Sequence, residues 1–528
     1  MDSPLDTIAA IATPLGEGGI GVIRLSGSQA VAIANKLFHP AKPVDLTSAP
    51  SHTCYFGNII EPSPALRAPS PRGRGPTDMP DLLPMGEGGQ RPDEGGQRVD
   101  QVVLTLFRAP HSYTGEDVVE ISAHGSPFVL QQILRLCIRH GARLAGPGEF
   151  TQRAFLSGKL DLTQAEAVAD LIRAKTDKAQ AAALAQLEGR LAAKVRDLRE
   201  AILPLLAHVE VGLDHSDEDH DFLKSGDLTA RCADIRAQIS EILDSARVGK
   251  ILREGLRVAL VGRPNVGKSS LLNALLKEDR AIVTPNPGTT RDTLEETVNW
   301  DGLPVVLTDT AGLREKAGDP VEHIGMERSR QALEGSDLVL ALFDGSEPLM
   351  EEDRQVMALV EDRPHLRVIN KCDLPEQWEG LPSSGLRPPS PRGRRPTAVD
   401  PLPMGEGARR AGEGVAVAER EPDMVVVRLS AKTGEGLMAL VQAVKQFALQ
   451  EKASAGEAQW LLNARHREAL ARADEALTEA CEAAKRDAFE ECVALELKTA
   501  LQALGEIIGE TATEDLLDQI FSTFCIGK

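Results

Sequence analysis

Gly262-Arg-Pro-Asn-Val-Gly267-Lys268-Ser269 is the stretch that decides the fold of the central part of this chain. It matches the pattern GxxxxGK[ST] and follows the apolar run Leu256 to Val261, which predicts a buried strand. In such a loop the glycines allow backbone N–H groups to surround phosphates. The lysine reaches the outer phosphates, and the serine hydroxyl binds magnesium. We therefore expect a nucleoside triphosphate site between a strand and a helix.

Four further motifs follow in chain order. Gly288-Thr289-Thr290-Arg291 offers a threonine to magnesium, and Asp309-Thr310-Ala311-Gly312 offers a magnesium-holding acid and a glycine N–H near the γ-phosphate. The aspartate of Asn370-Lys371-Cys372-Asp373 can accept both hydrogens of the N1 and 2-amino edge of guanine, which adenine lacks. Ser430-Ala431-Lys432 offers a backbone amide to the guanine oxygen. The set predicts GTP binding and resembles the translation-factor-related small GTPases.

These motifs lie at the ends of apolar runs that alternate with helical stretches. The runs are Leu256 to Val261, Val305 to Thr308, Leu338 to Phe343, Leu366 to Ile369 and Met424 to Leu429. Continuous apolar strands of this kind predict a mostly parallel α/β sheet with helices on both faces. The expected GTP contacts are Asn265, Val266, Gly267, Lys268, Ser269, Ser270, Thr284, Pro285, Asn286, Pro287, Gly288, Thr289, Thr290, Asp309, Thr310, Ala311, Gly312, Asn370, Lys371, Cys372, Asp373, Ser430, Ala431 and Lys432.

Hydrolysis needs a group other than the glutamine that Ras-like enzymes place directly after the DxxG motif, because that position is Leu313 here. Asn265 and the loop Thr284-Pro-Asn-Pro-Gly-Thr289 look like the arrangement with which some GTPases hold a potassium ion against the phosphates. Such an ion would do the work of an arginine finger. Glu322 is an acid that could orient water, although its residue type alone favours a solvated surface carboxylate.

Bulk composition sets broad limits. A length of 528 residues predicts about three or four domains, and the net charge of −20 means that nucleic-acid binding needs a local basic patch or a partner subunit. Neither a basic leader nor a membrane-length apolar run is visible, so we expect a cytoplasmic protein without a membrane partner. The seven cysteines form no CxxC pair, which favours reduced thiols over a disulfide framework or a zinc site.

Two low-complexity stretches are copies of each other. Leu66 to Arg91 reads LRAPSPRGRGPTDMPDLLPMGEGGQR, and Leu386 to Arg410 reads LRPPSPRGRRPTAVDPLPMGEGARR. Their arginines could form an RNA-contacting arm, but segments rich in Pro, Gly and Ser without an apolar face favour inserted disordered loops. We therefore exclude inserts at 62–98 and 382–420 when placing domains.

The remaining sequence divides into four parts. Residues 1–155 mix strand-like runs (Gly21 to Leu25, Val102 to Phe107, Val118 to Ser122) with helices, which predicts an α+β domain. A helical domain is expected at 156–253, where Thr163 with Glu166 reads as a capping box, and it resumes at 451–528. The GTPase domain at 254–450 is therefore expected as an insertion in a discontinuous helical domain.

Outside the two copies, almost the whole chain resembles the MnmE (TrmE) family of tRNA-uridine-modification GTPases. The most specific match is the end, Phe524-Cys525-Ile526-Gly527-Lys528. The stretches Asp6 to Pro14, Gly18 to Arg24, Tyr113 to Glu120 and Pro147 to Lys159 also look like this family. They span its folate-binding domain and the entry to its helical domain.

The resemblance implies a homodimer, formed through the N-terminal domains, that binds formyl-tetrahydrofolate as a one-carbon source. It also implies an FAD-dependent MnmG-type partner in a heterotetramer, which adds a carboxymethylaminomethyl or aminomethyl group to the wobble uridine of certain tRNAs. The family's folate contacts map onto Arg24, Glu120, Lys159 and Lys528. As lone residues, these four would more often be surface charges or local ion pairs.

The same resemblance assigns roles in hydrolysis. It implies that Glu322 orients water and that Ser269 and Thr290 bind magnesium. It implies potassium contacts at Asn265, Thr284, Asn286 and Thr289. The loop reads Pro-Asn-Pro where the family commonly has hydrophobic residues, which is tolerable if backbone carbonyls are the ligands there.

Several alternatives stay open. Cys525 is either a covalent catalyst or a small buried residue that packs the tail, and the acidic stretch Asp214 to Asp221 is either a metal site or a solvated turn, which we favour. A ribosome-assembly or signalling GTPase is the main rival function, although no RNA-binding module is visible beside the GTPase motifs. A folate-dependent enzyme merely regulated by GTP is a second rival. The sequence does not specify the tRNAs that are modified or the nitrogen donor.

Overall fold

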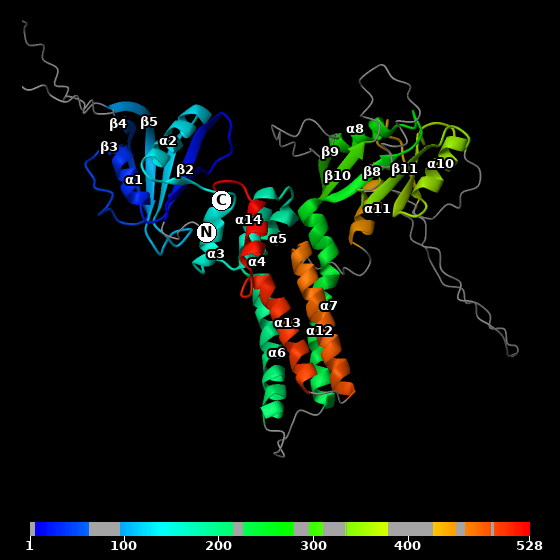
Figure 1. Ribbon diagram of the computed structural model, residues 1–528. Helices are drawn as coiled ribbons and strands as arrows, with labels where there is room; N and C mark the ends of the chain where they lie inside the picture. The colour runs from blue at the N-terminus through cyan, green and yellow to red at the C-terminus, as the bar shows by residue number, and fades with distance from the viewer. Residues whose placement is uncertain are drawn as a thin grey trace, which may run out of the picture. The chain divides into compact units, whose positions relative to one another are not determined.

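A computed structural model describes residues 6–62, 96–214, 225–278, 295–309, 333, 335–377, 426–449, 460–486 and 490–528 (Figure 1). The chain divides into two compact units. The first comprises Met1–Ile172, Ala183–Glu241 and Ala464–Lys528, and the second comprises Arg173–Ala182 and Ile242–Asn463. The chain therefore leaves the first unit and returns to it, and each unit is described by itself below.

The N-terminal part of the first unit is a seven-stranded sheet in the order β3-β4-β5-β6-β2-β1-β7. Alternation decides its faces: Ile23 and Leu25 of β2 are buried against α1 and α2, so Arg24 between them points to the opposite face. There α3 covers β1 through Phe150. The elements are β1 (Ile8–Ile11), β2 (Gly18–Ser26), α1 (Ala30–Leu37), β3 (Phe38–Pro40), β4 (Thr53–Pro62), β5 (Gly96–Phe107), β6 (Val118–Gly125), α2 (Pro127–Arg139), β7 (Arg143–Leu144) and α3 (Glu149–Leu156).

Long helices form the rest of the first unit, and α13 packs against both α6 and α12. Apolar residues of α12 recur at helical spacing and are buried, among them Leu470, Ala473 and Leu477. The helices are α4 (Leu162–Arg173), α5 (Asp177–Leu187), α6 (Arg190–Asp214), α7 (Ser225–Glu254), α12 (Ala464–Lys485), α13 (Glu490–Ile508) and α14 (Glu514–Ser522). Both α5 and α7 continue into the second unit.

The start of α4 differs from the expected Thr163–Glu166 capping box. Asp161 Oδ1 accepts the Gln164 N–H at 3.0 Å, and Gln164 Oε1 accepts the Asp161 N–H at 3.0 Å, so the box begins two residues earlier. Glu166 is instead buried in the helical core. Its carboxylate pairs with Arg465 at 2.9 Å and with His466 at 2.7 Å, partners that no local pattern could predict.

This charge cluster joins the two sequence halves of the helical part. Burial alone would raise the pKa of Glu166, but the charges of His466 and Arg465 outweigh it and lower the pKa to about 2. Arg465 also donates to the carbonyls of Glu506 (2.6 Å) and Ile507 (3.1 Å), which are otherwise unpaired acceptors at the end of α13. The residues on either side of the inserted unit are thereby held in one core.

The second unit is a six-stranded sheet in the order β13-β12-β11-β8-β10-β9, parallel except for β9. Every residue of β11 is buried, as a central strand covered on both faces requires. Leu340 and Leu342 face α8 and α11, whereas Ala341 and Phe343 face α10. The elements are β8 (Leu256–Val261), α8 (Lys268–Glu278), β9 (Glu295–Trp300), β10 (Leu303–Asp309), β11 (Leu338–Asp344), α10 (Glu351–Val360), β12 (His365–Asn370), β13 (Val426–Arg428) and α11 (Leu437–Leu449).

The expected fold class is confirmed: an α+β N-terminal domain, a discontinuous helical domain and an inserted α/β domain of the P-loop type. The apolar runs chosen from the sequence fall in strands of the expected sheets, except that the last one is a strand only over Val426–Arg428; Leu429 follows this strand, and residues 424 and 425 lie outside the described residues. The detailed boundaries near residues 155, 253 and 450 stay predictions. Both low-complexity copies and most of the acidic stretch, residues 215–221, lie outside the described residues.

Candidate functional site

The phosphate loop connects β8 to α8, as the motif predicted. Asn265 and Gly267 have positive φ angles of 67° and 98°, which turn the chain sharply before the helix. A Cβ on Gly267 would lie 2.2 Å from Asn370 Nδ2, so only glycine fits there. The loop thus presents the N–H groups of a helix start to the carboxyl edge of the sheet, a geometry suited to phosphate.

Lys268 and the serines after it lie at the start of α8. Lys268 Nζ donates to the carbonyls of Gly262 (2.7 Å) and Arg263 (2.8 Å), which holds its ammonium group against the loop. Ser269 and Ser270 are exposed in the first turn of α8. A cation and a hydroxyl are therefore placed beside the same helix start.

The guanine motif contacts the phosphate loop directly. Asn370, at the end of β12, donates from Nδ2 to the Val266 carbonyl at 2.8 Å and accepts the Ala431 N–H on Oδ1 at 2.9 Å. Ser430 Oγ donates to Asp373 Oδ1 at 2.7 Å, which fixes the carboxylate. The amide of Ala431, expected to meet the guanine oxygen, is engaged by Asn370, so its role toward a base stays a prediction.

Lys371 and Cys372 have contacts that the sequence did not indicate. Lys371 has a positive φ of 65°, and its Nζ pairs with Asp344 Oδ2 at 2.5 Å. Burial would raise the pKa of Asp344, but hydrogen bonds from Lys371 and Ser346 lower it. Cys372 has an exposed thiol, and its backbone N–H donates to the Leu429 carbonyl at 3.2 Å.

Arg263, inside the phosphate loop, is a further residue that sequence reasoning missed. Its Nε lies 3.2 Å from Asp353 Oδ1 at the start of α10, and a terminal nitrogen pairs with Glu347. The two acids follow β11, far along the chain, and only the parallel register of β8 with β11 brings them to this loop. No spacing rule in the sequence signals such a pair.

Several predicted residues cannot be placed. The whole loop from Thr284 to Thr290, the residues Thr310 to Gly312, Leu313 and Glu322 lie outside the described residues. Asp309 is the last residue of β10, in register with Leu260 of β8, so its backbone lies at the same sheet edge as the phosphate loop. Its assigned contact with magnesium stays a prediction.

The C-terminal tail lies against the N-terminal sheet. Ile526 forms an antiparallel bridge with Pro147, and the Gly148 N–H donates to the Cys525 carbonyl at 3.4 Å. Gly527 has a φ of 96°, and a Cβ there would lie 2.5 Å from the Ile11 carbonyl oxygen of β1. The chain end therefore folds back onto a domain whose sequence begins more than 500 residues earlier.

Arg24 connects the tail to the sheet. Its Nη2 pairs with Glu120 Oε1 at 2.8 Å, and its Nη1 lies 3.4 Å from the Gly527 carbonyl oxygen. The guanidinium also lies over the rings of Tyr113 and Phe150, at 5.5 and 5.7 Å from their centroids. Arg24, one of the four proposed folate contacts, thus joins a second, Glu120, to the tail in one half-buried cluster.

The other members of the predicted tail site are arranged differently. Lys159 is exposed on the loop between α3 and α4, and Lys528 is the half-buried last residue. Cys525 is exposed, so its interpretation as a buried packing residue is wrong; Phe524 is buried instead, against Phe521. The covalent interpretation of Cys525 stays a prediction.

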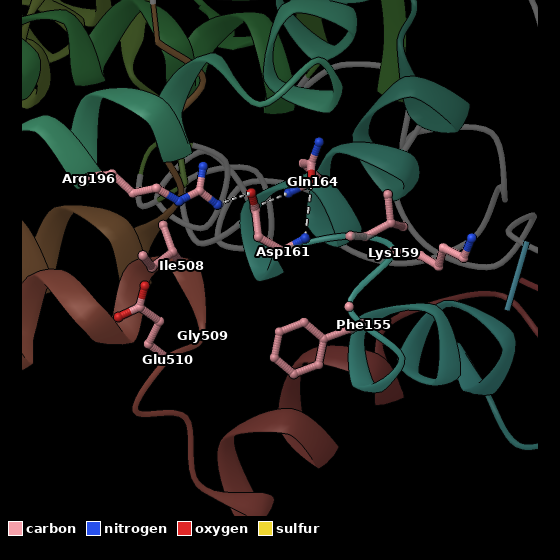
Figure 2. Close-up of a pocket in the computed structure, with 10 residues that line it drawn as sticks. Phe155, Lys159, Asp161, Gln164, Arg196, Ile508, Gly509 and Glu510 are labelled. Atoms are coloured by element: carbon pink, nitrogen blue, oxygen red, sulfur yellow. Dashed lines mark hydrogen bonds and ion pairs between the residues drawn. The ribbon is translucent and has the colours of Figure 1, made fainter. Parts of the chain in front are cut away.

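A cavity of about 300 Å³ lies beside Lys159, between the start of α4, α6 and the turn after α13 (Figure 2). Three of its polar residues contact each other: Arg196 pairs with Asp161 at 3.2 Å, and Asp161 accepts the Gln164 N–H. Glu510 pairs with Arg199. The ammonium group of Lys159 points away from Asp161 and Arg196. The cavity therefore offers no set of converging charges to the tail cluster.

Metal-ligand clusters and membrane-spanning helices can be sought among the described residues only. Within the ranges given above, three or more His, Cys, Asp or Glu side chains do not gather as metal ligands. Among the helices of that same part of the chain, none is both long and apolar enough to cross a membrane.

Comparisons with known proteins agree with this architecture. The model of the MnmE helical domain matches residues 162–525, and that of the GTP-binding protein TrmE N-terminus matches residues 7–159. The tRNA modification GTPase MnmE of Geobacillus kaustophilus is 41% identical over 99% of both chains, and that of Chloroflexus aurantiacus is 44% identical over 99% of this chain and 100% of its own.

A solved structure of Era from Aquifex aeolicus with GDP·AlF4⁻ covers 42% of this chain and 66% of its own at 25% identity. Its TM-score is 0.23, so it has no weight in the assignment. Family models together cover nearly the whole chain, and the relatives match it from end to end. The chain therefore belongs to the MnmE family of tRNA modification GTPases.

Proposed function

We propose that this chain hydrolyses GTP in a potassium-dependent manner and uses a one-carbon unit from formyl-tetrahydrofolate to modify the wobble uridine of certain tRNAs. With an FAD-dependent MnmG-type partner, it adds a carboxymethylaminomethyl or aminomethyl group. The chain itself acts as a homodimer within a heterotetramer, in the cytoplasm. Family membership supports the tRNA modification GTPase activity, and the finer steps are our proposal.

The observation that carries the folate part is the cluster of Arg24, Glu120 and the Gly527 carbonyl. The Glu120 carboxylate is of a type that can accept hydrogen bonds from the N–H edge of a pterin, and it is held in place by Arg24 at 2.8 Å. Lys159 and Lys528 are cations that can meet the carboxylates of a folate tail. Because Arg24 also contacts the tail carbonyl, tail and sheet would form one binding site.

The GTP part rests on the phosphate loop and the guanine motif. Lys268 and the N–H groups at the start of α8 would stabilise charge on the outer phosphates, and Asp373, fixed by Ser430, would select guanine. Magnesium would be held by Ser269 and Thr290, and it would neutralise charge that develops on the phosphates. Glu322 would orient the attacking water.

Potassium would be held by Asn265, Thr284, Asn286 and Thr289. Asn265 is the member of this set within the described residues, and its left-handed backbone, with a φ of 67°, turns the phosphate loop. We expect GTP turnover to rise steeply when potassium replaces sodium at equal ionic strength. Equal turnover in the two salts, with magnesium and GTP saturating, would remove potassium from the proposal.

Nucleoside analysis of tRNA tests the proposal as a whole. A strain that lacks this chain should accumulate tRNA with unmodified wobble uridines, and the full-length chain should restore the modification. Wobble uridines that are unchanged in the deletion strain would contradict the proposed function. In that case the alternative is a ribosome-assembly or signalling GTPase, and co-purification with ribosomal subunits rather than a flavoprotein would favour it.

A further inference from the structure

Two thiols lie together in the helical core, far from both proposed sites in sequence. Cys232 belongs to α7 and Cys481 to α12, and their exposed fractions are 0% and 5%. The two side chains hydrogen-bond with each other. Cys481 Sγ also lies 3.9 Å from the Thr229 carbonyl oxygen, one turn before Cys232 on the same helix. No sequence pattern indicates this pair, because the two residues are on opposite sides of the inserted unit.

The register of the two helices is fixed near the thiols. Arg236, one turn after Cys232, pairs through Nε with Asp474 Oδ1 of α12 at 2.9 Å. On α7 the ion pair follows the thiol, and on α12 it precedes the thiol, so the helices run antiparallel here. The ion pair thus prevents the helices from sliding and keeps Cys232 opposite Cys481.

The surroundings favour a reactive thiolate at Cys481. The hydrogen bond from Cys232 lowers the pKa of Cys481. Burial and the negative charge of Asp474 oppose this effect, and the positive charges of Arg236 and Lys485 add to it. The same hydrogen bond, together with burial, raises the pKa of Cys232. A thiolate at Cys481 would therefore be the attacking nucleophile, and Cys232 would keep its proton until a later step.

A small oxidant can reach the two thiols because the pair lies near two helix ends. In the structure α7 begins at Ser225, two turns before Cys232, and α12 ends at Lys485, one turn after Cys481. Terminal turns open at lower free-energy cost than the middle of a helix, so a small disulfide can reach this pair without global unfolding. The same freedom permits the small shift that a bond length of about 2.05 Å between the sulfurs needs.

We propose that Cys232 and Cys481 form a reversible disulfide that cross-links the start of α7 to the end of α12. The oxidant is a low-molecular-weight disulfide such as glutathione disulfide. The Cys481 thiolate attacks one sulfur of the oxidant and releases the first small thiolate. Cys232 then loses its proton and attacks Cys481 Sγ, releasing the second. Two protein thiols lose two electrons and two protons, and the oxidant becomes two small thiols.

Peptide mapping of the full-length chain tests this proposal. The chain is incubated with glutathione disulfide, blocked with an alkylating agent, digested without reductant and analysed by mass spectrometry. We expect a linked pair of peptides that contain Cys232 and Cys481, and reduction should separate them. Exposed cysteines, among them Cys54 and Cys525, should carry glutathione instead and report that the oxidant was active.

Matched variants separate the linkage from a folding defect. Cys232→Ala and Cys481→Ala should each abolish the linked peptides, whereas Cys54→Ala should leave them at the wild-type yield. Arg236→Gln, which keeps both thiols, should slow formation of the linked peptides several-fold, because it removes a charge that favours the thiolate and the ion pair with Asp474 that keeps the thiols opposite each other. Circular dichroism checks that each variant keeps its helices. Glutathione on Cys525 without any Cys232–Cys481 link in the folded wild type would overturn the proposal.

Discussion

The guanine-nucleotide site and the tail site are built in opposite ways. Contacts of the nucleotide site join loops that leave the carboxyl ends of parallel strands in one sheet, such as the bond from Asn370, after β12, to the Val266 carbonyl, after β8, on either side of β11. The tail site joins the two ends of the chain, where Arg24 of β2 meets the Gly527 carbonyl. Strand order alone assembles the first site. The second exists only once the helical part has folded and returned the chain end to the sheet.

Because the nucleotide site and the tail site are assembled independently, we expect a substitution in one site to leave the other intact. Asp373→Ala should have the largest effect on the nucleotide site, because it removes two hydrogen bonds from a carboxylate to guanine. At about 1.5–3 kcal/mol for each such bond, the affinity for GTP should fall on the order of 10³-fold. Titration with a fluorescent GTP analogue measures it. Asp362→Ala, an exposed acid of the same unit, is the matched control, and formyl-tetrahydrofolate binding should not change in either variant.

Glu322→Ala sharpens the comparison within the nucleotide site by separating binding from chemistry. If Glu322 orients water, kcat for GTP should fall by roughly 10²-fold, the scale of a positioned general base. The affinity for GTP should stay near wild type, because the phosphate loop and Asp373 are untouched. A variant that hydrolyses GTP at the parental rate would return Glu322 to an ordinary surface carboxylate.

Gly527→Ala perturbs the tail site with a single methyl group. That group would overlap the Ile11 carbonyl oxygen at 2.5 Å in a backbone conformation that costs non-glycine residues about 1–3 kcal/mol. We expect formyl-tetrahydrofolate affinity to fall by about 10-fold or more, as measured by calorimetry, with GTP turnover unchanged. Ile526→Ala is the control, since that side chain is 53% exposed and its bridge to Pro147 uses only the backbone. Equal folate affinities in the two variants would break the proposed link between tail and site.

Ser430→Ala should have the smallest effect. It removes the hydroxyl that donates to Asp373 Oδ1 at 2.7 Å but leaves the carboxylate that meets guanine. A hydrogen bond of this kind contributes about 0.5–1.5 kcal/mol, so GTP affinity should fall about 2- to 10-fold. Competition between GTP and xanthosine triphosphate should show that guanine is still selected. A loss as large as that of Asp373→Ala would mean that Ser430 contacts the nucleotide itself.

The fold could be predicted from the sequence where its cause is local. Leu338 to Phe343 is apolar throughout because β11 is covered on both faces, and the phosphate loop needs a glycine at 267 because its backbone has a φ of 98° there. Both features are visible in a short stretch of sequence, so the sheet and the phosphate loop could be predicted from it.

Features that depend on distant partners could not be predicted in this way. Glu166 looked like a capping residue because its partners, Arg465 and His466, come about 300 residues later. The pair of Arg263 with Asp353 has the same origin in tertiary packing. The tail site was found only through the resemblance of its last five residues to a family, and even then the exposure of Cys525 was not foreseen.

Deletion of Phe524 to Lys528 tests most directly whether the two sites are separate and whether both are needed. The shortened chain should bind and hydrolyse GTP at the wild-type rate, because every nucleotide motif lies between residues 262 and 432. In the same preparation, with the flavin-dependent partner and tRNA supplied, wobble-uridine modification should be lost. Modification at the wild-type level by the shortened chain would contradict the account, because the tail would then have no part in the one-carbon chemistry.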